Sequence, residues 1–281
     1  MKFRIEREAF ADAVAWAARS LASRPTLPVL AGLLLRVDGE RLSVSGFDLE
    51  ASNEVDLDVS AGASGAALVS GRLLADITRA LPPHPVDVTV DGARLTIACG
   101  AARFTLPTMP VEDYPSLPKM PTTAGSVDGA EFAAAVAQVA VAAGRDDTLP
   151  MLTGVRLEID GDKLTLAATD RYRLAVRELW WHPEDVAGAA AQVLVPARAL
   201  ADAAKSLAHS DTLTIALSSG GTGEGIIGFA GETSGRASRA TTRLLDATFP
   251  PYRSLLPTEW AASAEVAIAP LVEAVKRVAL V

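Results

Sequence analysis

Apolar positions follow the same helical spacing in two parts of the chain. Near residue 10 and again near residue 132, apolar side chains recur at i, i+4 and i+7, which places them on one face of a helix. They are Phe10, Val14 and Ala17, then Phe132, Val136 and Val139. The same shift of 122 residues aligns TLPVLAG at 26–32 with TLPMLTG at 148–154, so the chain contains an internal repeat.

Alternating polar and apolar positions follow each heptapeptide, which itself is expected to form a loop. LLLRV and RLSVSG flank Asp38-Gly39, and VRLEI and KLTLAA flank Asp160-Gly161. An Asp-Gly pair between alternating runs is typical of a β-hairpin. A looser match aligns residues 68–81 with 194–207, in each case a short strand running into a helix and followed by further strands. The pattern predicts an α+β protein, with two strand-helix-three-strand units in each repeat.

Turn-rich segments end both repeats and suggest domain boundaries. EDYPSLP at 112–118 and PPYRSLLP at 250–257 fit interdomain connectors. We expect domains at 1–121 and 122–260, and the start of a third at 261–281, where Leu271, Val275 and Val278 again have helical spacing. Because one repeat takes about 120 residues, the chain is expected to stop early in its third repeat. A docked or disordered C-terminal helix is the alternative interpretation.

Composition narrows the class of protein. With 281 residues, 49% of them apolar, the chain can bury large cores. It contains neither a signal peptide nor an apolar run long enough to span a membrane, which predicts a cytoplasmic protein. The net charge of -8 argues against a surface coated with basic residues, although it does not say where the charges lie. The only cysteine, Cys99, lies in the alternating run RLTIACG and is predicted to be a small buried side chain.

Five motifs, in order, resemble the bacterial sliding clamp family, the beta subunits of DNA polymerase III. They are MKFRIERE at 1–8, RPTLPVLAGLLL at 24–35, SGFDLE at 45–50, ATDRYRLAV at 168–176 and FPPYRSLLP at 249–257. The resemblance covers the whole chain, and the alanine-rich composition suits a high-GC, actinobacterium-like source. It implies repeated clamp domains with helices on one face and antiparallel sheets on the other. Two three-domain subunits would form a homodimeric ring around double-stranded DNA, and repeated sequence would follow from repeated geometry.

The resemblance also implies a peptide-binding pocket. It would capture short linear motifs of the DNA polymerase III alpha subunit, the clamp loader, other polymerases and repair proteins. The matching positions are Leu152, Thr169, Arg171, Tyr172, Arg173, Leu174, Pro250 and Leu255. Leu152, Leu174 and Leu255 are alternatively core residues. Some relatives carry Gly-His where this chain has Arg171-Tyr172, which would give the pocket a bulkier rim. In the family the third domain completes the pocket and the ring, so ring closure is not expected of this chain, and its first domain is expected to expose an unpaired edge.

Cations on the predicted helices are the candidates for contact with DNA. Eight positive against six negative side chains on these helices, in an acidic chain, predict a weakly positive lumen that contacts phosphates without reading bases. The helical candidates are Arg72, Arg79, Arg198 and Lys205. Arg24 and Arg145 are loop candidates, for which an ordinary solvated charge is an equal alternative.

The chain shows no catalytic constellation and no expected metal or cofactor. His84, His182 and His209 are scattered, which predicts turn and surface roles. Asp48 and Asp170 share one repeat position, which favours a side-chain to backbone bond at a strand end. Residues 223–228 match G-x-G-x-x-G, but the predicted strand context indicates a hairpin loop and not a dinucleotide site. We therefore expect a DNA-encircling processivity factor that is not an enzyme. The alternatives are a two-domain α+β ligand-binding protein or enzyme, and a peptide-binding scaffold that never binds DNA.

Overall fold

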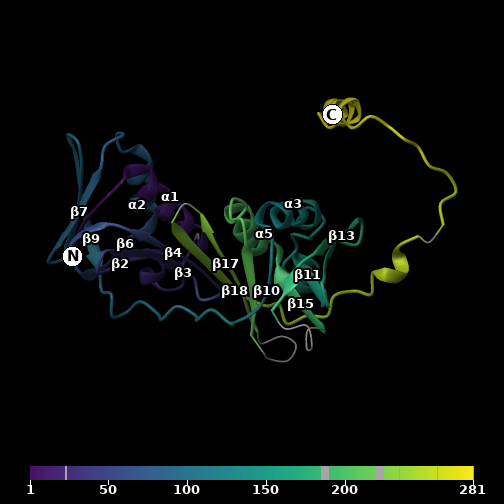
Figure 1. Ribbon diagram of the computed structural model, residues 1–281, viewed down its shortest axis with the longest axis horizontal. Coiled ribbons are helices and arrows are strands. Elements are labelled where there is room, and N and C mark those ends of the chain that lie inside the picture. The colour runs from purple at the N-terminus through teal and green to yellow at the C-terminus, as the bar shows by residue number, and fades with distance from the viewer. Residues whose placement is uncertain (23, 185–189, 219–224, 234, 258, 281) are drawn as a thin grey trace. The chain divides into compact units, whose positions relative to one another are not determined.

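The computed structural model describes residues 1–22, 24–184, 190–218, 225–233, 235–257 and 259–280. The chain divides into two compact units, Met1–Phe249 and Pro250–Val281. The first unit combines antiparallel strands with helices, as Figure 1 shows, and this confirms the predicted α+β class.

The first repeat follows the predicted order of elements. Phe10, Val14 and Ala17 are fully buried, as their spacing predicts. Gly39 and Gly92 have φ of 56° and 53°, so the Asp-Gly pairs form hairpin turns that require a left-handed residue. The elements are β1 (Lys2–Ile5), α1 (Arg7–Ala17), η1 (Ala18–Ser20), η2 (Pro28–Ala31), β2 (Gly32–Asp38), β3 (Arg41–Phe47), β4 (Ala51–Asp58), β5 (Ser60–Ala63), β6 (Gly65–Ser70), α2 (Gly71–Ala80), β7 (Val86–Asp91), β8 (Arg94–Cys99) and β9 (Ala102–Met109).

The second repeat has the same succession of elements. Its first long helix starts at an N-cap, where the Asp128 carboxylate accepts a hydrogen bond from the Glu131 N–H at 2.7 Å. The elements are β10 (Thr122–Val127), α3 (Gly129–Ala140), α4 (Pro150–Thr153), β11 (Gly154–Asp160), β12 (Lys163–Thr169), β13 (Leu174–Trp180), β14 (His182–Pro183), β15 (Ala190–Pro196), α5 (Ala197–Ser206), β16 (Leu213–Leu217), β17 (Ile226–Thr233) and β18 (Arg236–Arg243).

The repeated heptapeptide forms a short helical turn in both copies. It was predicted to be a loop, but η2 and α4 both begin at its proline, Pro28 or Pro150. Proline has its φ fixed near the helical value and lacks an N–H, so it starts a helical turn at little cost. The turn buries Leu30 or Leu152 just before the glycine that opens the next strand.

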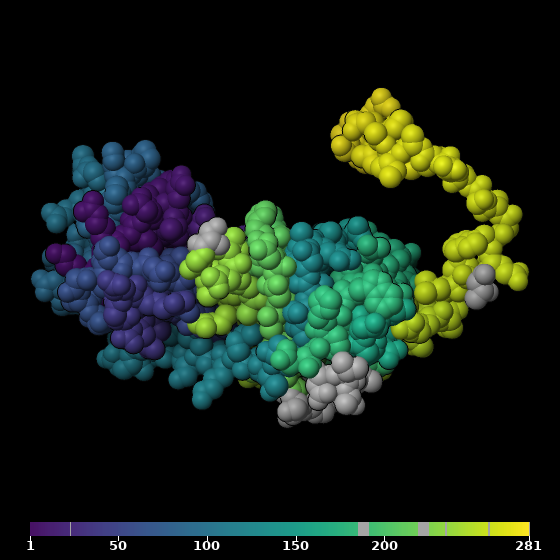
Figure 2. Space-filling model, in the orientation of Figure 1, coloured from purple at the N-terminus to yellow at the C-terminus, as the bar shows by residue number. Residues whose placement is uncertain are grey.

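One antiparallel strand pair joins the two repeats. β18 pairs with β4 from Ala237 opposite Asp56 to Thr242 opposite Ala51, which makes a sheet in the order β14-β10-β16-β17-β18-β4-β3-β2-β6-β9-β8-β7-β1-β5. A second sheet has the order β13-β12-β11-β15, so β13 lies at its edge. Figure 1 shows α1, α2, α3 and α5 along one side of the strands, and Figure 2 shows the surfaces of the two repeats in contact.

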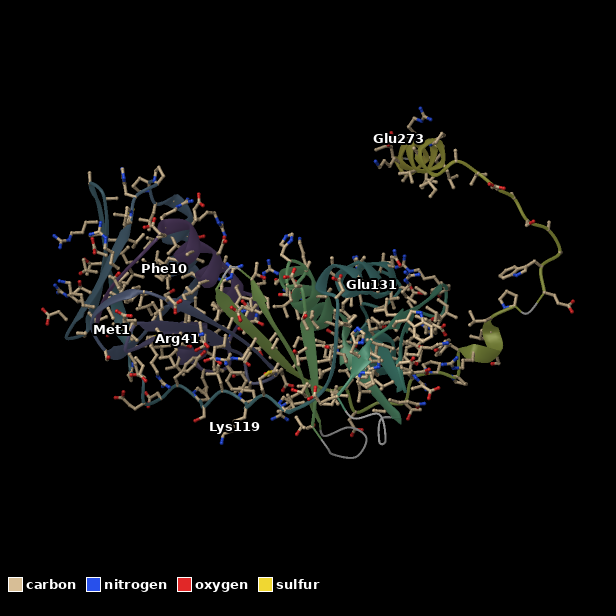
Figure 3. All side chains as sticks on the ribbon, in the orientation of Figure 1. Met1, Phe10, Arg41, Lys119, Glu131 and Glu273 are labelled. Carbon is tan, nitrogen blue, oxygen red and sulfur yellow. The ribbon has the colours of Figure 1, made fainter. Side chains whose placement is uncertain are left out.

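Two aromatic pairs mark the cores beneath the helices. The rings of Phe3 and Phe10 lie 5.9 Å apart, and so do those of Phe132 and Phe229. Phe10 on α1 is labelled in Figure 3. Cys99 is buried, as expected for a small core residue, and its one S–H can donate to the carbonyl of Pro82 or of His84, which lie 3.3 Å and 3.2 Å from the Sγ. Burial of such side chains contributes roughly 25 cal/mol per Å² of apolar surface.

Unpaired edges and the second unit complete the fold. Among the described residues, β9 pairs with β6 only through Thr108 and Met109, so its preceding residues have a strand on one side alone, which confirms the expected edge in the first repeat. The second unit contains η3 (Arg253–Leu255) and α6 (Ile268–Val278), and α6 is the predicted terminal helix. The domain boundaries themselves stay predictions. None of the described helices combines the length and apolar character needed to cross a membrane.

Candidate functional site

The same tight turn occurs at one position of both repeats. The Asp48 Oδ1 accepts hydrogen bonds from the N–H groups of Glu50 at 3.0 Å and Ala51 at 2.7 Å. The Asp170 Oδ1 accepts equivalent bonds from Tyr172 and Arg173, both at 3.0 Å. These bonds confirm the predicted structural role of the two aspartates.

Each turn also holds a non-glycine residue in the left-handed region. Leu49 has a φ of 79° and Arg171 a φ of 81°. Such backbone conformations are uncommon outside glycine and persist only where surrounding contacts impose them. The hydrogen bonds of the preceding aspartate supply those contacts. The residue that follows Arg171, Tyr172, is 91% exposed.

Further polar contacts brace the second-repeat turn. The Thr169 hydroxyl donates to the Arg173 carbonyl at 2.7 Å, and the Arg173 Nε lies 3.0 Å from the Asp170 Oδ2. Desolvation alone would raise the pKa of Asp170, but hydrogen bonds from the Tyr172 and Arg173 N–H groups and the charge of Arg173 outweigh it, so the pKa is lowered. The turn is therefore held by a charged carboxylate at neutral pH.

A loop faces this turn and has its own carboxylate anchor. The Asp146 Oδ1 accepts hydrogen bonds from the hydroxyl of Thr148 at 2.6 Å and from its N–H at 3.0 Å. These bonds, together with the positive charge of Arg171, lower the pKa of Asp146. The Gly144 N–H donates to the Leu152 carbonyl at 2.7 Å, which ties the loop to the helical turn of the heptapeptide.

Turn and loop enclose a cavity of about 450 Å³, here called the turn pocket. Buried Ala143 and Leu152 supply apolar surface, while arginines and exposed Tyr172 form the rim. The lining residues are Ala143, Gly144, Arg145, Asp146, Leu149, Leu152, Asp170, Arg171, Tyr172 and Arg173. An apolar base with a cationic, aromatic rim suits a short peptide with an apolar side chain.

The turn pocket brings together only part of the set predicted for peptide binding. Leu152, Arg171, Tyr172 and Arg173 line it. Thr169 braces the turn, and Leu174 is half-buried at the start of β13. Pro250 and Leu255 belong to the second unit, in which Leu255 is 70% exposed.

Several lining residues were missed by the sequence analysis. Leu149 belongs to the repeated heptapeptide and so carried a repeat signal, whereas Asp146 lies before it and corresponds to Arg24 in the first repeat, so it carried none. Arg145 was predicted for DNA contact, yet it lines the turn pocket. Ala143 and Gly144 could not be recognised by their chemistry, because they form part of the pocket wall only by being small beside Leu152.

The predicted DNA-contacting cations are all exposed. Arg72 and Arg79 lie on α2, and Arg198 and Lys205 occupy the aligned positions on α5. Arg79 approaches Asp76 at 3.9 Å, but both side chains are largely exposed, so this pair contributes little to stability. Arg24 lies exposed in the loop before η2, and Arg145 lies exposed in the loop before α4.

Within the described residues, the structure does not support a metal site or a dinucleotide-binding site. His84, His182 and His209 are exposed, as predicted, and no group of three or more His, Cys, Asp or Glu side chains in the described chain could hold a metal ion. The G-x-G-x-x-G match begins at Gly223 and Glu224, which lie outside the described residues. Its last part belongs to strand β17, whereas a dinucleotide fingerprint leads into a helix.

Comparisons with known proteins agree with the repeat. The family model "DNA polymerase III beta subunit, N-terminal domain" matches residues 1–118, and the "central domain" model of the same subunit matches residues 126–251. The chain is 58% identical over 281 residues to the beta sliding clamp of Streptomyces coelicolor, covering all of this chain and 73% of that protein. It is 49% identical to the beta sliding clamp of Micrococcus luteus, again over the whole chain, and covers 88% of that relative.

Solved structures give the same result for the fold. The crystal structure of the DNA polymerase III subunit beta from Pseudomonas aeruginosa has a TM-score of 0.80 and 30% identity, covering 92% of this chain and 69% of that one. A sliding clamp of the same species bound to griselimycin has a TM-score of 0.81, also at 30% identity, covering 92% and 68% of the two chains. The chain thus belongs to the DNA polymerase III beta subunit family, the DNA sliding clamps that serve as non-catalytic processivity subunits.

Proposed function

We propose that this clamp chain captures partner peptides in the turn pocket and contacts duplex DNA with its helices. The observation that supports peptide capture best is the turn pocket itself: an apolar base at Leu152 beneath an exposed Tyr172, rimmed by arginines. An apolar anchor in such a pocket supplies most of the affinity of a short linear peptide. A relative crystallised with griselimycin shows that a clamp of this fold accepts a ligand.

The proposed partners are those of a processivity factor. Peptides of the polymerase III alpha subunit, of the clamp loader and of other polymerases and repair proteins would compete for the turn pocket. Binding holds a polymerase beside its template, so its effective concentration at the DNA rises without any new contact to the reacting atoms.

For DNA, we propose contact through the exposed cations of α2 and α5, with Arg24 contributing from its loop. Arginine and lysine contacts to phosphate carry no sequence information, which suits a protein that must slide. Arg145 is proposed for both roles, since it lines the turn pocket from an exposed loop.

The free edge of β13 supports a further part of the proposal, ring assembly. β13 occupies the position in the second repeat that β4 occupies in the first, and β4 pairs with β18 of the neighbouring repeat. We propose that β13 accepts the corresponding strand of a third domain, with domains near 1–121 and 122–260, in a homodimeric ring.

Peptide capture can be tested by fluorescence anisotropy with a labelled peptide that carries the family's clamp-binding motif. Tyr172→Ala should weaken binding about tenfold, the effect of losing an exposed aromatic anchor worth roughly 1.4 kcal/mol. Trp180→Ala is the matched control, because Trp180 is 69% exposed in the same repeat but lies outside the turn pocket. Equal losses in both variants, or unchanged affinity in Tyr172→Ala, would contradict the assignment of the pocket.

A further inference from the structure

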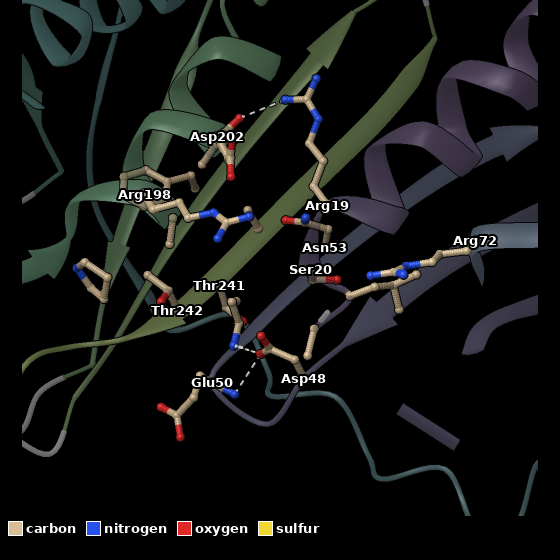
Figure 4. Close-up of a pocket in the computed structure, with 18 residues that line it drawn as sticks. Arg19, Ser20, Asp48, Glu50, Asn53, Arg72, Arg198, Asp202, Thr241 and Thr242 are labelled. Atoms are coloured by element: carbon tan, nitrogen blue, oxygen red, sulfur yellow. Dashed lines mark hydrogen bonds between the residues drawn. The ribbon is translucent and has the colours of Figure 1, made fainter. Parts of the chain in front are cut away.

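A second cavity lies where the two repeats meet, here called the junction pocket. Its volume is about 400 Å³, and Figure 4 shows it between the end of α1 and β4 on one side and α5 and β18 on the other. Thr241 and Thr242 of β18 face Asp48 and Glu50 of the first-repeat turn across it. This volume lies within the range of small-ligand sites.

One wall of the junction pocket repeats a wall of the turn pocket. Leu21, Ala22, Asp48, Glu50 and Ala51 line it, and each lies 122 residues before a residue that lines the turn pocket. The repeat has thus produced two cavities on the same turn. The junction pocket has a second wall from the following repeat, which gives it opposing surfaces.

The junction pocket holds two guanidinium groups with no partner in the described chain. Arg72 and Arg198 are each the second residue of a helix, α2 and α5, and come from different repeats. Neither makes a salt bridge or a side-chain hydrogen bond to another described residue. Arg19 of the same pocket is engaged, because it donates to the Asp202 carbonyl at 3.2 Å and to the Ser206 hydroxyl.

The acidic residues of the junction pocket are partly satisfied. The Asp48 carboxylate accepts two backbone N–H groups, and the Glu50 carboxylate lies 3.9 Å from the Arg243 Nε. Asp202 also lines the pocket, one helical turn after Arg198 on α5. Arg72 and Arg198 are the lining arginines that have no described partner and can bind an anion. Guanidinium groups bind carboxylates through paired hydrogen bonds, and two of them suit a ligand with two carboxylates.

The two pockets differ where the ligand would lie. Glu50 replaces Tyr172 and Ala51 replaces Arg173, so the junction pocket lacks the exposed aromatic rim. Its apolar contacts come from Leu21, Ala199 and Ala203. A ligand with a small apolar group beside its anionic end fits this lining.

We propose that the junction pocket binds the C-terminus of a short peptide whose last residue is acidic. The terminal carboxylate and the side-chain carboxylate contact Arg72 and Arg198, and the preceding apolar side chain packs near Leu21. This site goes beyond peptide capture in the turn pocket, because it is a separate cavity that would recognise the charged end of a peptide. It shares Arg72 and Arg198 with the proposed DNA contact, so the peptide and duplex DNA would compete for these two side chains.

The probe for this site is N-acetyl-Leu-Glu, titrated into the chain and followed by saturation-transfer NMR. Arg72→Ala and Arg198→Ala should each weaken binding about tenfold or more, as expected for loss of a charge-assisted hydrogen-bonded pair. Arg79→Ala and Lys205→Ala are matched controls: they remove exposed cations from the same two helices outside the pocket, and should leave binding unchanged. The neutral amide N-acetyl-Leu-Gln-NH₂ should not bind.

Other outcomes would overturn the inference. Equal binding of the neutral amide, or unchanged binding in the Arg72→Ala/Arg198→Ala double variant, would exclude carboxylate recognition there. Glutarate binding as tightly as the dipeptide would indicate a small-anion site, and displacement by inorganic phosphate at lower concentration would indicate a phosphate site. Duplex DNA binding of the four single variants, measured separately, distinguishes this inference from the proposed DNA contact: loss of DNA affinity with intact dipeptide binding overturns only the inference.

Discussion

The left-handed Arg171 is the residue on which the turn pocket depends. Glycine would adopt this positive φ without strain. Arginine at a φ of 81° accepts some strain, and its guanidinium is then available at the pocket rim beside Asp146. Arg171 therefore combines a strained backbone conformation with a positive charge at the rim of the turn pocket.

Replacement of Arg171 by a β-branched residue should destabilise the turn. Arg171→Val should lower the free energy of unfolding by about 1–2 kcal/mol, because branching at Cβ worsens the clash at positive φ. Arg171→Asn removes the same charge but tolerates the left-handed region, so urea unfolding should show a loss only for valine. Equal losses for the two variants would mean that the charge and not the backbone matters.

The carboxylate of Asp170 should make the turn sensitive to acid. A lowered pKa in the folded state means that the charged form stabilises folding above the unfolded pKa near 3.8, and that this contribution is lost as the pH falls through the folded pKa. The stability advantage of the natural chain over Asp170→Asn should therefore be full at pH 6 and shrink below pH 4 in urea unfolding.

The comparison for this effect is Asp162→Asn, which removes an exposed carboxylate from a hairpin of the same repeat. A difference between Asp170→Asn and the natural chain that stays constant from pH 6 to pH 3 would contradict a role for the charge.

The structural role of a residue could be predicted from the sequence where the residue recurred at the same position of both repeats. Asp170 was found because Asp48 occupies the same repeat position, and both form the expected bonds. Ala143 and Gly144 could not be found, because cavity walls formed by small residues depend on which segments meet in space. The positive φ at Arg171 also left no trace in its residue type.

At the scale of elements, local periodicity predicted the helices and hairpins. A helix or a hairpin depends on residues only a few positions apart, so one short stretch of sequence contains the whole pattern. The pairing of β18 with β4 was not predictable in this way, since the partners lie far apart in the chain. The helical turn at each heptapeptide was missed because a segment of four residues is too short to show helical periodicity.

The β4–β18 junction should depend on Arg239. Its Nη2 lies 3.1 Å from a Glu54 carboxylate oxygen and 2.8 Å from one of Asp56, and these side chains are only partly exposed. Arg239→Ala should therefore lower the free energy of unfolding by about 1–2 kcal/mol, more than an exposed pair would.

Arg79→Ala is the control for this prediction, since it removes the exposed 3.9 Å contact with Asp76 and should cost less than about 0.5 kcal/mol. Urea unfolding in low and high salt measures both. A loss no greater for Arg239→Ala than for Arg79→Ala would show that the strand pairing alone holds the junction.

For the whole molecule, an acidic chain that binds DNA requires its cations to be gathered where the duplex lies. The proposed contacts on α2 and α5 meet this requirement on the helical side of the strands, while the net charge stays at -8. Each phosphate contact releases counterions, so affinity for duplex DNA falls with salt.

Loss of one such contact should change this salt dependence. Lys205→Ala should reduce the slope of log affinity against log salt by about one unit, with equal effect on different duplex sequences, as measured by anisotropy. His209→Ala, which changes an exposed residue just beyond the same helix, is the control and should leave the slope unchanged. A sequence-dependent loss in Lys205→Ala would argue for base contact and against a sliding interface.

Among the described residues, β13 ends its sheet, and its side chains differ from those of β4, the matching strand of the first repeat. Where β4 presents Ser52, Glu54 and Asp56 along one face, the same positions of β13 are Leu174, Val176 and Glu178. The edge of β4 suits a strand that carries an arginine, as β18 does at Arg239, whereas the edge of β13 favours an apolar partner. A β18-like strand with an arginine at the Arg239 position would place that charge beside aliphatic groups on β13, so the strand that pairs with β13 is expected to carry a different residue there.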